Sequence, residues 1–347
     1  MAYTDIDKPS EHFGTLIFTG DNTNNRDITG LDFTPDFTWI TSRAAASDNG
    51  MFDSVRGATK SIRSNSNRAE DTSPDNKDID SFISGGIRVD QSNYIDTNTN
   101  NALQVAWNWK AANGNTTNTD GDVDTVISAN QAAGFSIVSY TVSGTNPLTT
   151  GHGLSKAPEL MLWRSRARES NWTVYAKPIG NAKKLSLNGT GAEANTGGFN
   201  STTPSSTLFT HGGYYNADTI IYYAFHSVQG YSKIGSYTSI NDHDSNFIYL
   251  GFKPAMIIFK NTSYSGGSDW HIIDRTRYTF NGASEATIEL NTTDAENYSA
   301  FGEIDFVSNG FKIRNNNGVS SGGYDHIYMA FAESPFVTST GVPTTAF

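Results

Sequence analysis

The feature that most constrains this 347-residue sequence is an internal repeat, because five landmarks occur three times in the same order. An aromatic residue followed by Thr comes first, a proline before an apolar run second, and the motif Asn-x-x-x-Ala-Glu third. Ser-x-x followed by a large apolar residue is fourth, and an apolar closing strand with an Ala-aromatic pair is fifth. In order, the landmarks start at Phe18, Tyr140 and Tyr237; Pro35, Pro158 and Pro254; Asn65, Asn188 and Asn291; Ser84, Ser206 and Ser308; and Ala106, Ala224 and Ala330. The chain is therefore predicted to contain three copies of one unit of about a hundred residues.

The landmarks set the expected domain boundaries. They predict an N-terminal arm at 1–12, repeat 1 at 13–110, a polar linker with a short strand at 111–134, repeat 2 at 135–228, repeat 3 at 229–336 and a C-terminal arm at 337–347. We expect the two polar arms to be loosely held and free for contacts.

Composition indicates the fold class. Only 17% of the residues are charged, whereas Gly (32 residues), Ser, Thr and Asn are abundant. Thr favours strands, Asn and Gly favour turns, and pairs such as Asn309-Gly310 predict tight hairpins. No helical stripe of ten or more residues is present. The sequence predicts an all-β fold of three tandem antiparallel β-sandwich modules, and the bulky closing strands predict sheets buried on both faces.

Several classes of protein are disfavoured. The net charge of −11 gives no basic surface for nucleic acid, and the absence of cysteine excludes a thiol nucleophile or disulfide framework. The first residues have no apolar signal-peptide core, and no apolar run is long enough to cross a membrane, so we expect neither secretion by a leader nor membrane insertion.

Longer strings resemble one known family. These are MAYTDIDKPSEHF, FDSVRGATK, AWNWK, ISANQAAGFSIVSYT, GHGL, VQGYSKIGSYT and IYMAFAESPF. They resemble virion proteins of marine tailed bacteriophages that carry a repeated lectin-like domain of unknown function. The resemblance implies a concanavalin-type jelly roll, a place in the virion after synthesis in the host cytoplasm, other tail or capsid proteins as partners, and assembly as a homo-oligomer. It supplies no catalytic residues and no cofactor.

The repeated motif invites an enzymatic interpretation, but its threefold repetition favours a structural one. A glycosidase needs two carboxylates in one site, whereas the motif supplies one Glu per repeat. We expect a structural loop in which each Glu is satisfied within its own repeat, formed by Asn65 and Glu70, Asn188 and Glu193, and Asn291 and Glu296. Asp53 and Asp274 also correspond, with Ala176 in repeat 2, and Asp53 is expected to hold a surface ion pair with Arg56 or Lys60.

Two further sets of residues are candidate binding sites. Asp120, Asp122 and Asp124 alternate as ligands of calcium can, but the glycine bend and later Glu of a calcium loop are missing, so we expect a solvated linker. Exposed aromatic rings could stack on sugars, and the candidates are Trp172, Trp270, Tyr214, Tyr215 and Tyr324. For the two tryptophans, which occupy the position of Asn49 in repeat 1, core packing is the preferred interpretation.

These observations predict a non-enzymatic phage virion protein. The preferred role is an adhesion component, of the tail-fibre or receptor-binding type, that recognises a host-surface glycan. The alternatives are head decoration or another architectural role without a ligand and, more remotely, a polysaccharide depolymerase, which would need paired carboxylates in a cleft.

Overall fold

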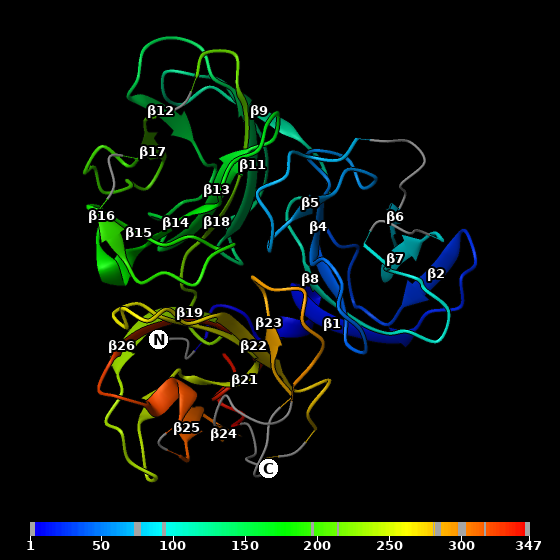
Figure 1. The fold of residues 1–347 in the computed structure, drawn as a ribbon, viewed down its shortest axis with the longest axis vertical. Coiled ribbons are helices and arrows are strands. Elements are labelled where there is room, and N and C mark those ends of the chain that lie inside the picture. The colour runs from blue at the N-terminus through cyan, green and yellow to red at the C-terminus, as the bar shows by residue number, and fades with distance from the viewer. Residues whose placement is uncertain are drawn as a thin grey trace.

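The computed structural model describes residues 4–72, 78–91, 95–195, 198–213, 215–279, 281, 286–297, 303–315 and 317–343. The fold is all-β, with 44% strand and 3% helix, and is β-sandwich-like, as the composition predicts. The helical segments are the short 3-10 turns η1 (Pro9–Glu11), η2 (Lys177–Ile179) and η3 (Gly318–Ser320). Figure 1 shows three lobes around a common centre, which we call lobe 1 (13–110), lobe 2 (111–228) and lobe 3 (229–336).

Lobe 1 contains two antiparallel sheets. The large sheet has the strand order β1 (Phe13–Thr19), β8 (Leu103–Trp109), β3 (Phe37–Ser42), β4 (Gly50–Asp53) and β5 (Ile62–Arg63). The small sheet has the order β2 (Arg26–Thr29), β7 (Gly86–Val89) and β6 (Ile79–Ile83).

Lobe 3 has the same strand order. Its large sheet contains β19 (Ser232–Thr238), β26 (Asp325–Pro335), β21 (Phe252–Asn261), β22 (Trp270–Asp274) and β23 (Ile288–Glu289), and its small sheet contains β20 (Phe247–Tyr249), β25 (Gly310–Ile313) and β24 (Ile304–Val307). Asn309 lies in the tight turn from β24 to β25, which confirms that hairpin. Pro254 lies at an irregularity of β21, a position where the missing N–H of proline is tolerated.

Lobe 2 has a wider sheet, and its first part corrects the expected linker at 111–134. The sheet order is β14 (Thr173–Ala176), β13 (Leu160–Ser165), β18 (Thr219–Phe225), β11 (Phe135–Thr141), β10 (Thr125–Asn130) and β9 (Thr116–Asn118). The two-stranded sheets are β12 (Leu148–Gly151) with β17 (Leu208–His211) and β15 (Lys183–Lys184) with β16 (Ala194–Asn195). Because β9 and β10 extend the sheet at β11, this segment is part of the lobe.

The strand registers correct one landmark. Thr19, Thr141 and Thr238 pair with Leu103, Thr219 and Asp325, so the closing strands align from those three residues. Trp107 then corresponds to Tyr223 and Met329, two residues before the Phe of the second and third Ala-aromatic pairs. The sequence alone cannot distinguish the two alignments, because a shift of two residues leaves each side chain on the same face of the strand.

The central strands of each large sheet are buried on both faces, as the bulky closing strands predict, whereas the edge strands β1, β9 and β19 are partly exposed. One face packs against the lobe's own small sheet, over a core that includes Phe52 in lobe 1, Tyr222 in lobe 2 and Phe311 in lobe 3. The other face enters a central core to which all three lobes contribute. The lobes are therefore joined through apolar packing as well as through the chain.

Three equivalent residues mark the centre of this packing. Trp109, Phe225 and Phe331 occupy the same position of the three closing strands, and their ring centroids are 6.4, 6.2 and 5.6 Å apart in pairs. A mutual contact of equivalent residues is what a pseudo-threefold axis produces. The three lobes thus surround an internal axis, along which Figure 1 is approximately viewed.

The described part of the N-terminal segment 1–12 is docked, which corrects the expectation of a free arm. Thr4 and Asp5 both bond to the carbonyl of Gln229 at the junction of lobes 2 and 3, and Ile6 is buried in the central core. Within the expected C-terminal arm at 337–347, the backbone N–H of Ser339 donates to Asp7 over 2.6 Å. The described parts of both terminal segments are thus held in place: Ile6 gains burial in the central core, and Ser339 bonds to Asp7.

Candidate functional site

The asparagines of the repeated motif perform the same structural task in each lobe. The side-chain oxygens of Asn65, Asn188 and Asn291 accept the backbone N–H of Asn49, Trp172 and Trp270 over 3.0, 2.8 and 2.7 Å. Their amide nitrogens donate to Asp48, Asn171 and Asp269 over 2.8, 2.8 and 2.7 Å. The motif is therefore a structural loop.

The glutamates of the motif contact the next lobe, not only their own. The backbone N–H of Glu70 in lobe 1 donates to the carbonyl of Arg166 in lobe 2 over 2.9 Å. Glu193 in lobe 2 contacts Thr262 in lobe 3 in the same way over 2.8 Å, and Glu296 in lobe 3 contacts Arg43 in lobe 1 over 3.0 Å. The motif closes a ring from lobe 1 to 2, 2 to 3 and 3 to 1. The expectation that each Glu side chain is satisfied within its own repeat is wrong for Glu70 and Glu296, whose carboxylates pair with an arginine of the next lobe. The Glu193 carboxylate does pair within its own lobe, with Lys183.

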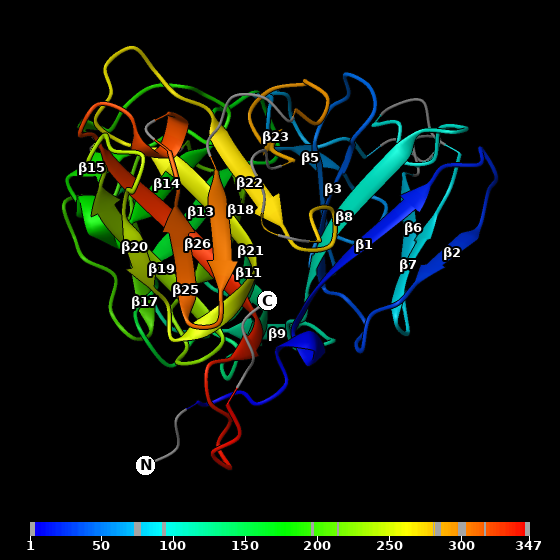
Figure 2. The same ribbon diagram turned by 90° about the horizontal axis from the view of Figure 1, so that it is seen from below.

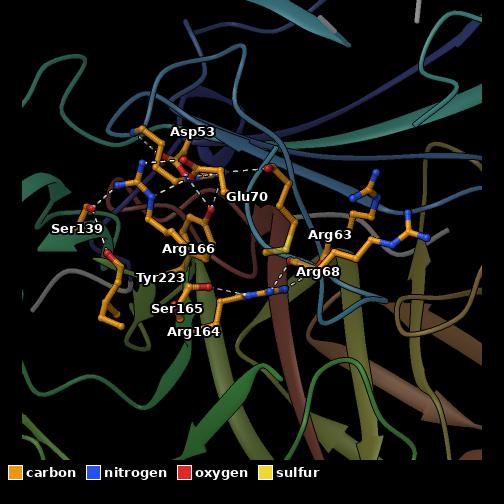
Figure 3. Close-up of polar contacts among 12 residues, drawn as sticks. Asp53, Arg63, Arg68, Glu70, Ser139, Arg164, Ser165, Arg166 and Tyr223 are labelled. Carbon is orange, nitrogen blue, oxygen red and sulfur yellow. Dashed lines mark hydrogen bonds and ion pairs between the residues drawn. The ribbon is translucent and has the colours of Figure 1, made fainter. Parts of the chain in front are cut away.

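A buried ion-pair network lies at the boundary of lobes 1 and 2 (Figure 3). Arg56 lies between Asp53 and Glu70, at 2.5 and 3.0 Å, and Arg166 of lobe 2 makes a bidentate contact with Glu70 at 2.8 and 2.9 Å. Tyr223 of lobe 2 donates to Asp53 over 2.8 Å. Asp53 and Arg56 are buried, so this pair is not the surface ion pair expected from the sequence.

The boundary of lobes 3 and 1 repeats this network. Arg277 lies between Asp274 and Glu296, at 2.6 and 2.9 Å, and Arg43 of lobe 1 contacts Glu296 at 2.8 Å. Trp107 of lobe 1 takes the role of Tyr223 and donates its indole N–H to Asp274 over 2.9 Å.

At the boundary of lobes 2 and 3, the residues of this network are replaced together. The positions of Asp53, Arg56, Tyr223 and Arg166 are taken there by Ala176, Ile179, Met329 and Thr262. Glu193 remains, but its side chain is 31% exposed and pairs with Lys183 at 3.4 Å. A buried charge without a partner is costly. Where Ala176 replaces the carboxylate of Asp53, the residues that would donate to that carboxylate are therefore replaced as well.

The carboxylates of the complete networks are poor candidates for acid–base catalysis. Burial alone would raise the pKa of Glu70, but the positive charges of Arg56 and Arg166 outweigh it and hold that pKa below its ordinary value. A general acid must carry a proton near neutral pH, which Glu70 does not. These residues hold the lobes together.

The two candidate tryptophans are buried at the lobe boundaries. Trp172 and Trp270 are 1% and 3% exposed. Their indole N–H groups donate to the carbonyl of Arg63 in lobe 1 and of Ser186 in lobe 2, over 2.7 and 2.8 Å. They fill the contact between lobes, in agreement with the preferred packing interpretation, and present no ring to a ligand.

The three aspartates of the metal candidate do not converge. Asp122 accepts the backbone N–H and the hydroxyl of Thr149, both over 2.8 Å. The backbone N–H of Asp120 donates to the side-chain oxygen of Asn118 over 2.8 Å. Within the described residues, no group of three or more His, Cys, Asp or Glu side chains is placed to hold a metal ion. Thr149 explains the position of Asp122 without a cation.

The two tyrosine candidates that the structure describes, Tyr215 and Tyr324, lie away from the central core. Tyr215 is 70% exposed, Tyr324 is partly buried against Tyr264 with ring centroids 4.9 Å apart, and Tyr214 lies outside the described residues. When the closing strands are aligned by their registers, Tyr324 of lobe 3 corresponds to Asp218 of lobe 2.

Tyr215 forms one edge of an open pocket of about 730 Å³ on lobe 2. The guanidinium of Arg168 lies 3.9 Å from the ring centroid of Tyr215 and pairs with buried Asp218 at 2.5 Å, which fixes its position. The rest of the lining is mainly polar: Glu169, Ser170, Thr173, Lys184, Asn195, three glycines and Trp163. A ring beside several hydrogen-bonding groups can bind a polar ligand that has one apolar face.

Sequence reasoning found Tyr215 but missed Arg168 and Lys184. Arg168 belongs to the run Arg-Ser-Arg-Ala-Arg at 164–168, and this local concentration of positive charge in an acidic chain was the available signal. Arg164 and Arg166 of the same run serve the lobe boundary: Arg164 donates to the carbonyls of Ser66 and Asn67, each over 2.9 Å.

These features define an all-β, β-sandwich-like protein whose three repeats close into a ring around a shared core. A family model described as a domain of unknown function (DUF7483) matches residues 8–335, and the chain belongs to this family. The matched range includes all three repeats, so the family unit corresponds to the complete ring. No curated protein matches the chain. Among the described residues, no helix has the length and apolar character that crossing a bilayer requires.

Proposed function

We propose that this protein is a non-enzymatic component of a phage particle that recognises a host-surface glycan through the pocket at Tyr215. One observation carries the proposal: a 70% exposed aromatic ring is held by Arg168 beside a polar concavity. The C–H face of a pyranose can pack on a tyrosine ring, while its hydroxyls need donors and acceptors such as those of Arg168, Asn195 and Glu169. The surface of lobe 2 combines both.

The carboxylates favour binding over hydrolysis. A glycosidase needs two carboxyl groups on either side of the scissile bond. Glu169 is the one carboxylate of the described pocket lining, and the repeated glutamates lie at lobe boundaries. This distribution supports an adhesion component over a polysaccharide depolymerase.

The place in the virion is proposed from the resemblance of the sequence. By the same resemblance, each lobe is a lectin-like jelly roll, and the partners are other tail or capsid proteins. Head decoration is the competing role, and it requires no pocket with an exposed ring. Immunogold labelling of particles with an antibody to this chain distinguishes label at the tail from label over the head.

Binding is tested with the full chain on a glycan array, followed by titration of the best ligand. Tyr215→Ala is expected to weaken binding at least about tenfold, because it removes the stacking surface, and Tyr215→Phe should retain most of the affinity. Tyr264→Ala is the matched control, since Tyr264 is also an exposed tyrosine but lies outside this pocket. Unchanged binding by Tyr215→Ala would exclude this pocket as the site.

A further inference from the structure

The small sheet of lobe 3 presents two aromatic rings on its outer surface. Phe247 and Tyr249 are 50% and 55% exposed, whereas Ile248 between them is 8% exposed and belongs to the core of the lobe. Side chains two residues apart on a strand point to the same side, with Cα atoms about 6.5 Å apart. Strand β20 thus carries both rings on one face, and Figure 2 shows β20 beside β19 and β25 on the outside of lobe 3.

The other two lobes show that the fold does not need these rings. Strands β2 and β12 occupy the place of β20 and pair with β7 and β17 as β20 pairs with β25. Aligned on these registers, the residues corresponding to Phe247 and Tyr249 are Asp27 and Thr29 in lobe 1, and Thr149 and Gly151 in lobe 2. Exposed apolar surface without a folding role indicates a binding site.

The ring of Tyr249 is held in place from two directions. A Cβ added to Gly251 would meet the Tyr249 hydroxyl at 3.6 Å, so the ring lies along the bare backbone of this glycine. The ammonium of Lys233, on the neighbouring strand β19, lies 5.7 Å from the ring centroid and donates to the carbonyl of Tyr249 over 2.6 Å. Contact on these sides leaves the rest of the ring free for a ligand.

Lys233 adds a positive charge that the described residues do not neutralise. Its contacts within the described chain are the carbonyl and the ring of Tyr249, and no carboxylate pairs with it there. Lys312, which is opposite Phe247 in the sheet, is neutralised by exposed Asp244 at 2.7 Å. An ammonium with free N–H donors next to two exposed rings is complementary to a sugar that carries a carboxylate.

We propose that Phe247, Tyr249 and Lys233 form a second carbohydrate site, on lobe 3, for an acidic polysaccharide chain of the uronic-acid class. The rings stack on successive sugars, and Lys233 binds a carboxylate of the polymer. The site extends the proposed function but depends on different residues from the Tyr215 pocket, so each can fail without the other.

The test uses alginate as the acidic polymer and dextran as the neutral one, with binding measured by affinity electrophoresis and calorimetry on the full chain. The variant Phe247→Thr/Tyr249→Thr introduces a residue that lobe 1 or lobe 2 carries at the same places, so it should fold. Its association constant for alginate is expected to fall at least about tenfold. Lys233→Gln should weaken alginate binding and reduce its dependence on salt.

The remaining outcomes are equally definite. Tyr215→Ala should leave alginate binding unchanged, and this result separates the second site from the proposed pocket. Failure of the native chain to bind alginate, or equal binding by the Phe247→Thr/Tyr249→Thr variant, overturns the inference. So does a change confined to self-association in sedimentation velocity, which would make this face a contact between copies of the chain.

Discussion

The hydroxyl of Tyr223 donates a 2.8 Å hydrogen bond to the carboxylate of Asp53 across the boundary of lobes 2 and 1, and at the equivalent boundary of lobes 2 and 3 the two positions are Met329 and Ala176. Donor and acceptor are therefore present together or absent together. Since both positions are buried, either residue alone would leave a polar group without its partner.

This relationship predicts that the network can be exchanged as a unit. Asp53→Ala alone leaves Arg56 buried beside an apolar group and should lower the free energy of unfolding by about 3–5 kcal/mol. Adding Arg56→Ile and Tyr223→Met, the residues of the apolar boundary, should restore most of the loss. Urea denaturation of the single, double and triple variants measures this recovery. If the losses in the free energy of unfolding simply add from the single to the triple variant, the residues of the network are not coupled.

The glutamates of the motif should differ in their importance. Glu70→Ala and Glu296→Ala each remove the shared partner of two arginines and should destabilise by about 3–5 kcal/mol. Glu193→Ala removes a partly exposed pair with Lys183 and should cost less than about 1 kcal/mol. Thermal melting of the three variants provides the comparison, and a loss for Glu193→Ala as large as for Glu70→Ala would contradict the assignment.

Four buried histidines should make the fold sensitive to acid. Burial lowers the pKa of His152, His211 and His326 to about 4 and that of His271 to about 3. Below about pH 6.5 the unfolded chain binds protons that the folded chain does not, so stability should fall as the pH decreases from 6.5 towards 4. At pH 5 each histidine contributes a loss of about 1–2 kcal/mol.

The measurement is the melting temperature between pH 7 and pH 5. His271→Gln should reduce the slope, because Gln does not titrate. An unaltered slope for His271→Gln would mean that this histidine is protonated in the folded chain as well.

The shared core predicts that the three lobes unfold together. One face of each large sheet lies in the central core, so lobe 2 expressed alone (111–228) would expose Phe225 and its neighbours. We expect a single calorimetric transition for the full chain, and aggregation or partial folding for the isolated lobe. Three separate transitions, or a stable monomeric lobe 2, would show that the lobes are independent domains.

Much of the architecture was predictable from the sequence. The threefold recurrence of landmarks indicated three equivalent units, and the abundance of Thr for strands and of Asn and Gly for turns indicated an all-β chain. Bulky neighbours such as Tyr222 and Tyr223 indicated sheets buried on both faces, because side chains alternate across a strand. These inferences use local periodicity and composition, and such properties are carried by neighbouring residues.

The tertiary structure alone decided how the units meet. Glu70 and Arg166 are 96 residues apart, and only the packing of two large sheets around Trp109, Phe225 and Phe331 places them in contact. The same packing turned two candidate tryptophans into boundary contacts and left Phe247 and Tyr249 on the surface. A contact between distant residues depends on how whole sheets are placed in space, and local sequence patterns do not specify that placement.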